Sequence, residues 1–308
     1  MTGFAATCSS NPSRSGRDGL LRLGFERRAR ATGEAANHIT ALRHCRYTLP
    51  LQVLSPLTLD DGTSYLLLLN PTGGVLGGDR LRTEIDLGEH SSVCLSTPSA
   101  TRIYRTAGPP AEMHTVLRLA TGATLEYLPD HVIPHAGSRL QQTLRIEMQE
   151  GSRGIFLDAF AAGRVAQNEQ WRFREFDSRT EVTLRGKLIH FSRINLAGAA
   201  SPATGHLPLG DCHSSPSSLG CMSSYSYCAS LLIVADKFPD WRPVLASLRA
   251  ELEAVPGVIG GASLLTEAGC SARCLASSAI DLHKATRRLW AAARREVLSR
   301  APFDPRKY

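Results

Sequence analysis

The stretch Asn70-Pro-Thr-Gly-Gly-Val-Leu-Gly-Gly-Asp79-Arg80 contains two glycine pairs and lies between two segments with strand character. Glycine reaches backbone angles that other residues avoid, so the two pairs predict a sharp turn or a close approach between backbones. Residues 65–69 before it form an apolar run, and residues 81–87 after it alternate apolar and polar side chains with the period of a strand. The glycines are therefore predicted to connect one strand to another.

This connection excludes the two common nucleotide-binding motifs. A phosphate-binding loop requires Lys-Ser or Lys-Thr after its last glycine and a helix behind it, whereas Asp79-Arg80 here leads into a strand. The dinucleotide-binding fingerprint also requires a following helix. The glycine-rich stretch is therefore not expected to bind phosphate.

A strand, a glycine and a second strand recur three times after this turn. The glycines are Gly88, Gly122 and Gly151, a spacing of roughly thirty residues that is typical of stacked supersecondary units. Each unit exposes one apolar face, so successive units are expected to stack and bury it. We predict a mainly β fold of stacked β-hairpins that form two facing sheets or a β-helix-like core. Further strands are predicted at 171–176 and 181–184, with a turn at Asp177-Ser178 between them.

The remaining segments complete a single domain over residues 19–308. Residues 197–224, rich in Ala, Gly, Ser and Pro, are predicted to form an irregular, mobile surface loop. Two C-terminal α-helices are predicted, one capped by Asp240 and one by Ser277 or Ser278. The second helix is expected to turn a set of arginines outward: Arg287, Arg288, Arg294 and Arg295.

The composition is that of a globular protein, with 43% hydrophobic and 20% charged residues. No apolar run approaches the roughly 18 residues of a membrane helix. Residues 1–18 are rich in Ser and Arg and lack the apolar centre of a secretion signal, so we expect a disordered N-terminus, or alternatively a transit peptide, and a cytoplasmic protein. The net charge of +7 indicates a solvated basic face or an acidic protein partner. Nucleic acid is not expected as a partner, because basic and aromatic residues are not interleaved.

Few residues have a pattern that indicates chemistry. No Gly-x-Ser-x-Gly elbow is present, so a hydrolase triad has no anchor. Asp79 either accepts hydrogen bonds from turn amides or supplies a polar group to a channel for a hard or borderline cation. His131 and His135 form either a metal-binding pair or surface imidazoles at a turn.

The cysteine and histidine residues near the loop lack the two tight pairs of a structural zinc site. Eight cysteines in a cytosolic chain of this length are expected to remain reduced, so free thiols are the preferred interpretation. Asp158 and Arg164 bracket the turn at Gly163, where a structural ion pair is possible. The cysteine and histidine set is His206, Cys212, His213, Cys221, Cys228, Cys270 and Cys274.

Several motifs occur together in an order typical of one known family. Gly73-Gly74-x-x-Gly77-Gly78-Asp79-x-Leu81 is followed by a strand and by Thr97-x-x-x-Thr101-Arg102-x-Tyr104-Arg105. The chain therefore resembles the UreD family, also called UreH, of urease accessory proteins, over residues 19–308. Supporting motifs are Gly19 to Phe25, Leu125 to Pro129 with Ile133, Gly163-Arg164, Leu289-Trp290 with Arg294, and Pro305-Arg306.

The resemblance implies a non-enzymatic scaffold and metallochaperone. Members of the family bind the urease apoprotein together with UreF and with UreG, which hydrolyses GTP and delivers nickel. Nickel is thought to travel through a polar tunnel in the UreD protein, so no tightly bound cofactor is expected, only transient Ni(II). The resemblance makes Asp79, Thr101 and Asp158 metal-path candidates.

We add His131 to these candidates, although the family usually has an acid or amide near this position and an apolar residue near His135. The motif residues expected to have structural roles are Gly73, Gly74, Gly77, Gly78, Tyr104, Arg105, Gly163 and Arg164. Two alternatives stay open at this point. One is a β-rich hydrolase that uses Asp79 and Asp158 as acid and base, and the other is an assembly module without a metal path.

Overall fold

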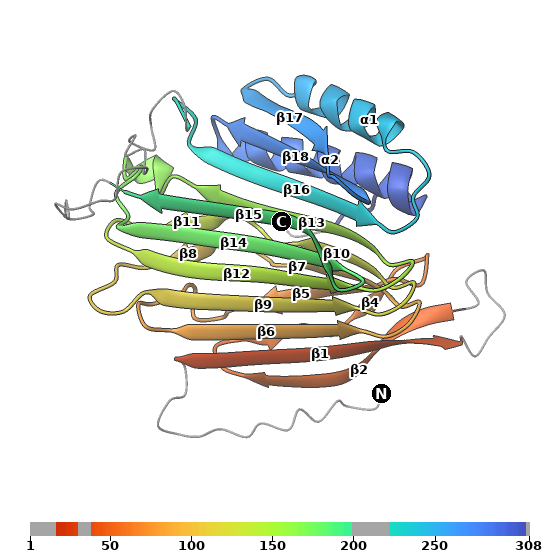
Figure 1. The fold of residues 1–308 in the computed structure, drawn as a ribbon. Coiled ribbons are helices and arrows are strands. Elements are labelled where there is room, and N and C mark those ends of the chain that lie inside the picture. The colour runs from red at the N-terminus through yellow and green to blue at the C-terminus, as the bar shows by residue number, and fades with distance from the viewer. Residues whose placement is uncertain (1–16, 30–37, 199–221, 306–308) are drawn as a thin grey trace.

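The computed structural model describes residues 17–29, 38–198 and 222–305, which form two β-sheets facing each other and two helices (Figure 1). The first sheet has the order β15 (Lys187–Ala197), β14 (Glu175–Leu184), β12 (Arg139–Met148), β9 (Ala111–Leu119), β6 (Arg80–Leu87), β1 (Asp18–Ala29) and β2 (His38–Thr48). The second has the order β17 (Val258–Leu264), β18 (Gly269–Ala276), β16 (Tyr227–Ala235), β13 (Arg153–Ala161), β10 (Thr124–Leu128), β7 (Ser92–Ser96), β5 (Ser64–Leu69) and β3 (Gln52–Val53).

Short elements complete the fold at the margins of the second sheet. They are β4 (Leu57–Thr58), β8 (Thr101–Ile103), β11 (Val132–Pro134) and a 3-10 turn at Val165–Gln167. The two helices are α1 (Arg242–Glu253) and α2 (Ala279–Leu298), and neither helix of the described ranges is long and apolar enough to span a membrane. Residues 1–16 of the predicted disordered segment and 199–221 of the predicted loop lie outside these ranges.

The main strands from β5 to β14 alternate between the two sheets, which confirms the prediction of a mainly β, β-helix-like core. The two strands that flank each repeated glycine do not pair as a hairpin would. Each pairs in parallel with the equivalent strand of the next repeat, as β6 does with β9 and β7 does with β10. This arrangement places the apolar faces of both strands opposite each other across the core, where both are removed from water.

The repeated turns stack on one another. Gly122 and Gly151 have φ values of +67° and +68°, a region that side chains other than glycine rarely adopt. The Gly122 amide donates to the Glu150 carbonyl of the next turn at 2.9 Å. Turns one repeat apart therefore satisfy each other's backbone polar groups, and this keeps the strands in register.

Each sheet is parallel in its middle and antiparallel at its edges. In the first sheet β2 and β15 run antiparallel to β1 and β14. In the second sheet β3 and β4 run antiparallel to β5, and β16, β18 and β17 follow one another in antiparallel order after β13. The parallel coil is thus bounded on both sides by strands of reversed direction.

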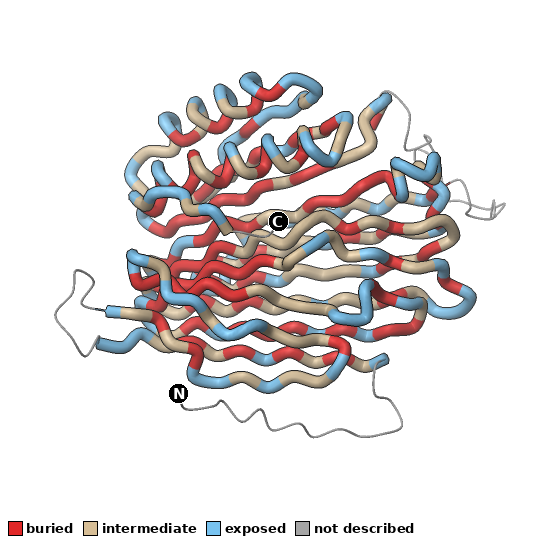
Figure 2. Tube along the Cα trace, turned by 180° about the vertical axis from the view of Figure 1, so that it is seen from behind, coloured by how far each residue is buried: buried red, intermediate tan, exposed pale blue. Residues whose placement is uncertain are grey.

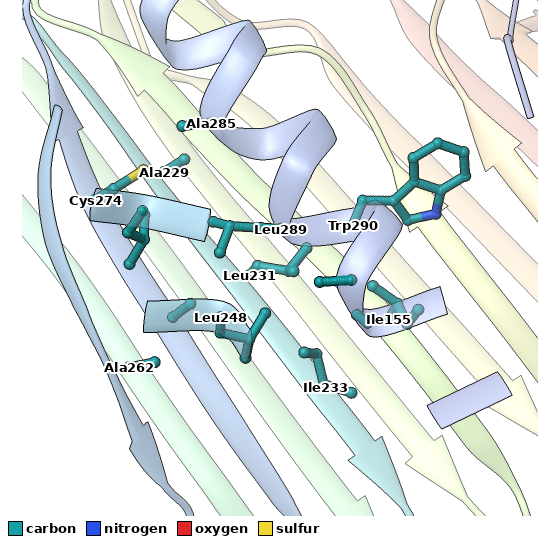
Figure 3. Packing of buried hydrophobic residues seen from close by; sticks show 14 of the residues in the cluster. Ile155, Ala229, Leu231, Ile233, Leu248, Ala262, Cys274, Ala285, Leu289 and Trp290 are labelled. Carbon is teal, nitrogen blue, oxygen red and sulfur yellow. The ribbon is translucent and has the colours of Figure 1, made fainter. Parts of the chain in front are cut away.

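Buried apolar residues of both sheets form a core cluster, and the buried segments of the strands are red in Figure 2. Inward positions such as Ile85, Leu117, Leu125 and Ile146 are fully buried. A second core lies between the helices and the outer face of β13, β16 and β18 (Figure 3). There Leu248 of α1 and Leu289 of α2 face Leu231 of β16 and its neighbours.

The predicted helix caps are close to those observed. The Ser278 hydroxyl accepts a hydrogen bond from the Asp281 amide at 3.1 Å, so Ser278 is the cap of α2 as predicted. For α1 the cap position is Trp241, and the Asp240 carboxylate accepts from the Arg242 amide at 3.0 Å.

The prediction that Arg294 points outward is wrong, because this side chain is only 2% exposed. Its guanidinium forms an ion pair with Glu126 of β10 and another with Asp61 at 2.8 Å. The indole Nε1 of Trp290 also donates to Glu126, at 2.6 Å. Glu126 is fully buried, so Arg294 provides the opposite charge that allows a carboxylate to lie in the core. Helix α2 is thereby fixed to β10.

The glycine-rich turn packs against the segment that follows β7. Val75 pairs with Ile103, and its amide donates to the Arg102 carbonyl at 2.8 Å. A side chain at Gly74 would approach the Tyr104 ring within 2.5 Å, so glycine is needed there for the close approach. Asp79 lies at the end of the turn, 7% exposed, and its Oδ2 accepts from the Leu76 amide at 2.8 Å. Burial raises the pKa of the Asp79 carboxyl, although the Leu76 amide and Arg17 act in the opposite direction.

We expect Arg294→Met to reduce the free energy of unfolding by about 3–5 kcal/mol, because it leaves the buried Glu126 without its countercharge. The matched control is Arg287→Met on the same helix, where the guanidinium pairs with the exposed Asp304 at 3.4 Å and should contribute at most about 1 kcal/mol. Urea unfolding of both variants measures the difference. Equal stability of the two variants would contradict a structural role for the buried pair.

We expect Asp79→Ala to cost about 1–3 kcal/mol of unfolding free energy, because the Leu76 amide loses its acceptor. Asp79→Asn should cost less, since the amide oxygen can still accept from Leu76 and burial already disfavours the charged form. Asp86→Ala, at an exposed position of β6, is the control. If Asp79→Ala unfolds at the same urea concentration as this control, the turn does not depend on the carboxylate.

Candidate functional site

A polar cluster crosses the space between the two sheets. Asp158 of β13 projects from the second sheet, and Gln142 of β12 and Ser178 of β14 reach it from the first. Gln142 Nε2 donates to Asp158 Oδ1 at 3.3 Å, and Ser178 Oγ donates to Asp158 Oδ2 at 3.1 Å. Gln142 Nε2 also donates to Ser178 Oγ at 2.8 Å. Three strands thus hold one carboxylate between the two sheets.

The local sequence explains why these polar groups face inward. Gln142 occupies the same alternating positions of β12 as the fully buried Leu140 and Ile146. Ser178 lies between the buried Phe176 and Val182 in the same way on β14. Both strands therefore direct a polar residue into the core at the level of Asp158.

The surroundings of Asp158 shift the pKa of its carboxyl group. Burial raises the pKa of its carboxyl above the usual value, and the hydrogen bonds from Ser178 and Gln142 and the charge of Arg273 only partly oppose this. A carboxylate that has lost solvation gains more than an exposed one from a proton or a cation. Asp158 is therefore suited to interact with a positively charged species that enters the interior.

Asp158 lines two cavities between the sheets. The larger, of about 100 Å³, is also lined by Thr101, Gln142 and Asp130. The smaller, of about 30 Å³, includes Ser178 and Arg273. A cavity needs about 10–15 Å³ by this measure to hold one water molecule, so both have room for water beside polar partners.

The interior comes close to the surface at a gap in the second sheet. Strand β10 pairs with β13 as far as Tyr127 and Phe156, and β11 resumes the pairing at Val132 and Phe160. Between these points residues 157–159 pair with neither of the two strands, and the segment 129–131 passes beside them. Pro129, Asp130, Leu157 and Ala159 line both the larger inter-sheet cavity and an outer groove of about 410 Å³ next to the start of α2.

The predicted metal-path residues are distributed over this region and the glycine-rich turn. Thr101 and Asp158 line the same cavity. His131 lines the adjoining outer groove. Asp79 lies in its turn and is not among the residues that line either cavity of Asp158. The structure thus brings three of the four candidates into one region of the molecule.

His131 and His135 have different neighbours. The His131 ring packs edge-on against Tyr227, with centroids 5.7 Å apart, whereas His135 packs against Tyr104 at 5.0 Å. Burial lowers the pKa of both imidazoles. Within the described ranges, no group of three or more His, Cys, Asp or Glu side chains is arranged to hold a metal ion.

The expected ion pair between Asp158 and Arg164 is wrong. Arg164 instead binds Glu169, with Nε to Oε2 at 2.8 Å, because the turn after β13 brings Glu169 back beside it. Gly163 allows this turn, since a side chain there would lie 2.3 Å from the Glu169 carbonyl oxygen. The hydroxyl of Tyr104 donates to the Gly73 carbonyl at 3.3 Å, and the Arg105 side chain lies against Gly137.

The predicted turn at Asp177-Ser178 is also wrong, because both residues lie inside the continuous strand β14. Ser178 is paired with Gln142 of β12 on one side and Ile194 of β15 on the other, and its hydroxyl donates to Asp158 in the interior. Sequence reasoning therefore missed Ser178, and it missed Gln142, Asp130 and His283 as well. For Gln142 and Ser178 the signal is a polar side chain at the same alternating positions as buried neighbours, and it can be read only once the inward register of the strand is known.

The described cysteines are free thiols, as predicted: Cys45, Cys94, Cys228, Cys270 and Cys274. Burial raises the pKa of Cys228 and Cys270 to about 12 and that of Cys274 to about 11, so burial favours the protonated thiol of all three at neutral pH. His206, Cys212, His213 and Cys221 lie outside the described residues.

Comparison with known proteins confirms the resemblance drawn from the motifs. A family model described as "UreD urease accessory protein" matches residues 17–308. A Mycolicibacterium gilvum (strain PYR-GCK) protein is 34% identical over 282 residues, which cover 90% of this chain and 94% of the relative. An Opitutus terrae protein is 30% identical, covering 90% and 96%, and an Alkalilimnicola ehrlichii protein is 31% identical, covering 97% and 93%.

All three relatives bear the name urease accessory protein UreD. The matches extend over almost the whole length of each chain, and they include the glycine-rich turn and the strands that carry the polar cluster. This chain therefore belongs to the UreD family of urease accessory proteins.

Proposed function

We propose that this protein is a non-enzymatic scaffold in urease maturation that binds the urease apoprotein with UreF and UreG and provides part of the path by which nickel reaches the active site. Nickel is a cargo in this proposal and not a resident cofactor. The observation that carries the proposal is the polar cluster at Asp158, which opens onto two cavities between the two sheets.

The chemistry of the cluster suits transient passage of a cation. Ni(II) accepts carboxylate, imidazole and water ligands, and a transfer path requires ligands that exchange readily. A single carboxylate with neutral hydroxyl and amide partners attracts a hydrated cation without enclosing it. Thr101 and Asp130 extend this polar lining toward the gap in the second sheet.

The alternative of a hydrolase with Asp79 and Asp158 as acid and base has little support in the geometry. An acid and a base must both reach one substrate bond. Asp158 lines two cavities, whereas Asp79 lines neither of them and accepts a hydrogen bond within its own turn. The two carboxylates therefore do not flank either of these spaces.

Exposed apolar residues support binding to other proteins. Leu188 and Phe191 lie on β15, at one edge of the first sheet, and Ile259 and Leu264 lie on β17, at one edge of the second. Strand β17 contains no charged residue, and an uncharged edge strand readily pairs or packs with another chain. We assign these edges to partner binding, in a cytoplasmic complex where the free thiols stay reduced.

The scaffold role is tested by expressing a tagged chain together with urease, UreF and UreG. We expect the tag to retain all of these partners, and urease made without this chain to lack nickel. Purified chain alone should show no ureolytic or glycosidase activity. Failure to retain any partner, with normal urease nickel in the absence of the chain, would reject the proposal.

The path itself is tested by Asp158→Leu, which replaces the carboxylate with an apolar side chain of similar size. The fold should remain, because Gln142 and Ser178 still bind each other. We expect the complex with urease to assemble and the nickel content per active site to fall, with a smaller fall for Asp158→Asn, which keeps a wet interior.

Asp86→Leu on the outer face of the first sheet is the control for this experiment, because that side chain is exposed. Metal analysis of purified urease and a pull-down of the complex give the two readouts. Full nickel content with an intact complex in Asp158→Leu would show that the cation does not pass this point, and an assembly role without a metal path would then be favoured.

A further inference from the structure

Two histidines from distant parts of the chain line the outer groove at the gap in the second sheet. His131 immediately precedes β11, and His283 lies in the second turn of α2. Both side chains are half-buried. Burial lowers the pKa of the His131 imidazole; the Asp130 carboxylate opposes this, and the charge of His283 adds to it.

The position of His131 is well defined by its surroundings. The Thr101 amide donates to the His131 carbonyl at 3.1 Å, and the Asp130 amide donates to Thr97 Oγ1 at 2.8 Å. The imidazole also packs edge-on against Tyr227. The opposite wall is equally fixed, because Arg294 and Trp290 hold α2 to Glu126. The two imidazoles therefore belong to rigid elements on either side of one groove.

We propose that His131 and His283 form a loading site for a divalent cation of borderline softness at the outer mouth of the inter-sheet cavity. The identification of nickel as the biological cargo of this site rests on the function proposed above. Binding of a divalent cation by the site does not depend on that function. Imidazole suits Ni(II), Co(II) and Zn(II), whereas Mg(II) and Ca(II) prefer oxygen ligands.

The site is open rather than closed. Two imidazoles leave the remaining coordination positions to water or to a group from a partner protein. Lys284 lines the same groove, and its positive charge weakens cation binding. Asp130 borders both the groove and the inter-sheet cavity, so a released cation meets a carboxylate on the inward side. This arrangement favours rapid exchange over tight retention.

The test is equilibrium dialysis of the folded full-length chain against nickel chloride, with cobalt(II) absorption as a second probe. His131→Phe retains a ring for the contact with Tyr227 and removes the ligand, and His283→Gln retains a polar helical side chain. His114→Ala is the control, because that imidazole lies on the exposed face of β9 and binds Thr143. Circular dichroism confirms that each variant is folded.

We expect each single histidine variant to weaken nickel binding at this site by at least about tenfold. Loss of a residue that only supports a metal ligand already costs about this much, and loss of the ligand itself should cost no less. The double variant should lose binding at this site, but by less than the sum of the two single losses in free energy, because both changes affect the same site. Lys284→Met should strengthen binding, and magnesium binding should be unchanged throughout.

Wild-type nickel affinity in both histidine variants would overturn the site, as would additive losses that indicate two independent sites. Either result leaves the scaffold role standing, because that role is tested by nickel in urease. Conversely, a normal nickel content of urease in the Asp158→Leu variant would reject the inner path. A loss of nickel binding in the histidine variants would still establish the site at His131 and His283.

Discussion

Each strand of the central coil buries its apolar face against the strand that follows it, across the core rather than beside it in the same sheet. The glycines at positions 122 and 151 allow the tight turns that this requires, and the amide of one turn binds the carbonyl of the next. Residues one repeat apart in the chain consequently become neighbours within a sheet. This packing decides where a polar group can be placed, because any residue at an inward position faces the opposite sheet.

The buried charges at the helix-covered side follow from the same arrangement. Glu126 occupies a position of β10 where burial would be very unfavourable for a lone carboxylate, and Arg294 and Trp290 of α2 satisfy it. The interaction orients α2 on the second sheet. It also sets the distance between the start of α2 and the segment after β10, since both lie on elements that meet at Glu126. The geometry of the outer groove thus depends on a contact formed several turns away along the helix.

The sequence was sufficient to predict the class of fold, because alternating apolar residues report which face of a strand is buried. Periodicity does not report which strand is the partner, so hairpins and facing strands could not be distinguished at Gly88 or Gly122. The same limit explains the errors at Arg294 and Ser178. Arg294 was assigned from its place on an outward helix face, and Ser178 from a turn dipeptide. In the structure each side chain binds a carboxylate distant in sequence: Glu126 for Arg294 and Asp158 for Ser178.

The candidate site was predictable in part. Thr101 and Asp158 were chosen from family motifs, and they share a cavity. Gln142 was missed because a lone amide in a strand gives no signal until its inward register is known.

The reversed strands at both margins of the coil have one further consequence. Strands β2 and β15 run against the parallel direction, so the parallel coil ends at β1 and β14 in the first sheet. Inserting a whole repeat in the middle would move the two ends apart, and deleting one would bring them together, without altering either end.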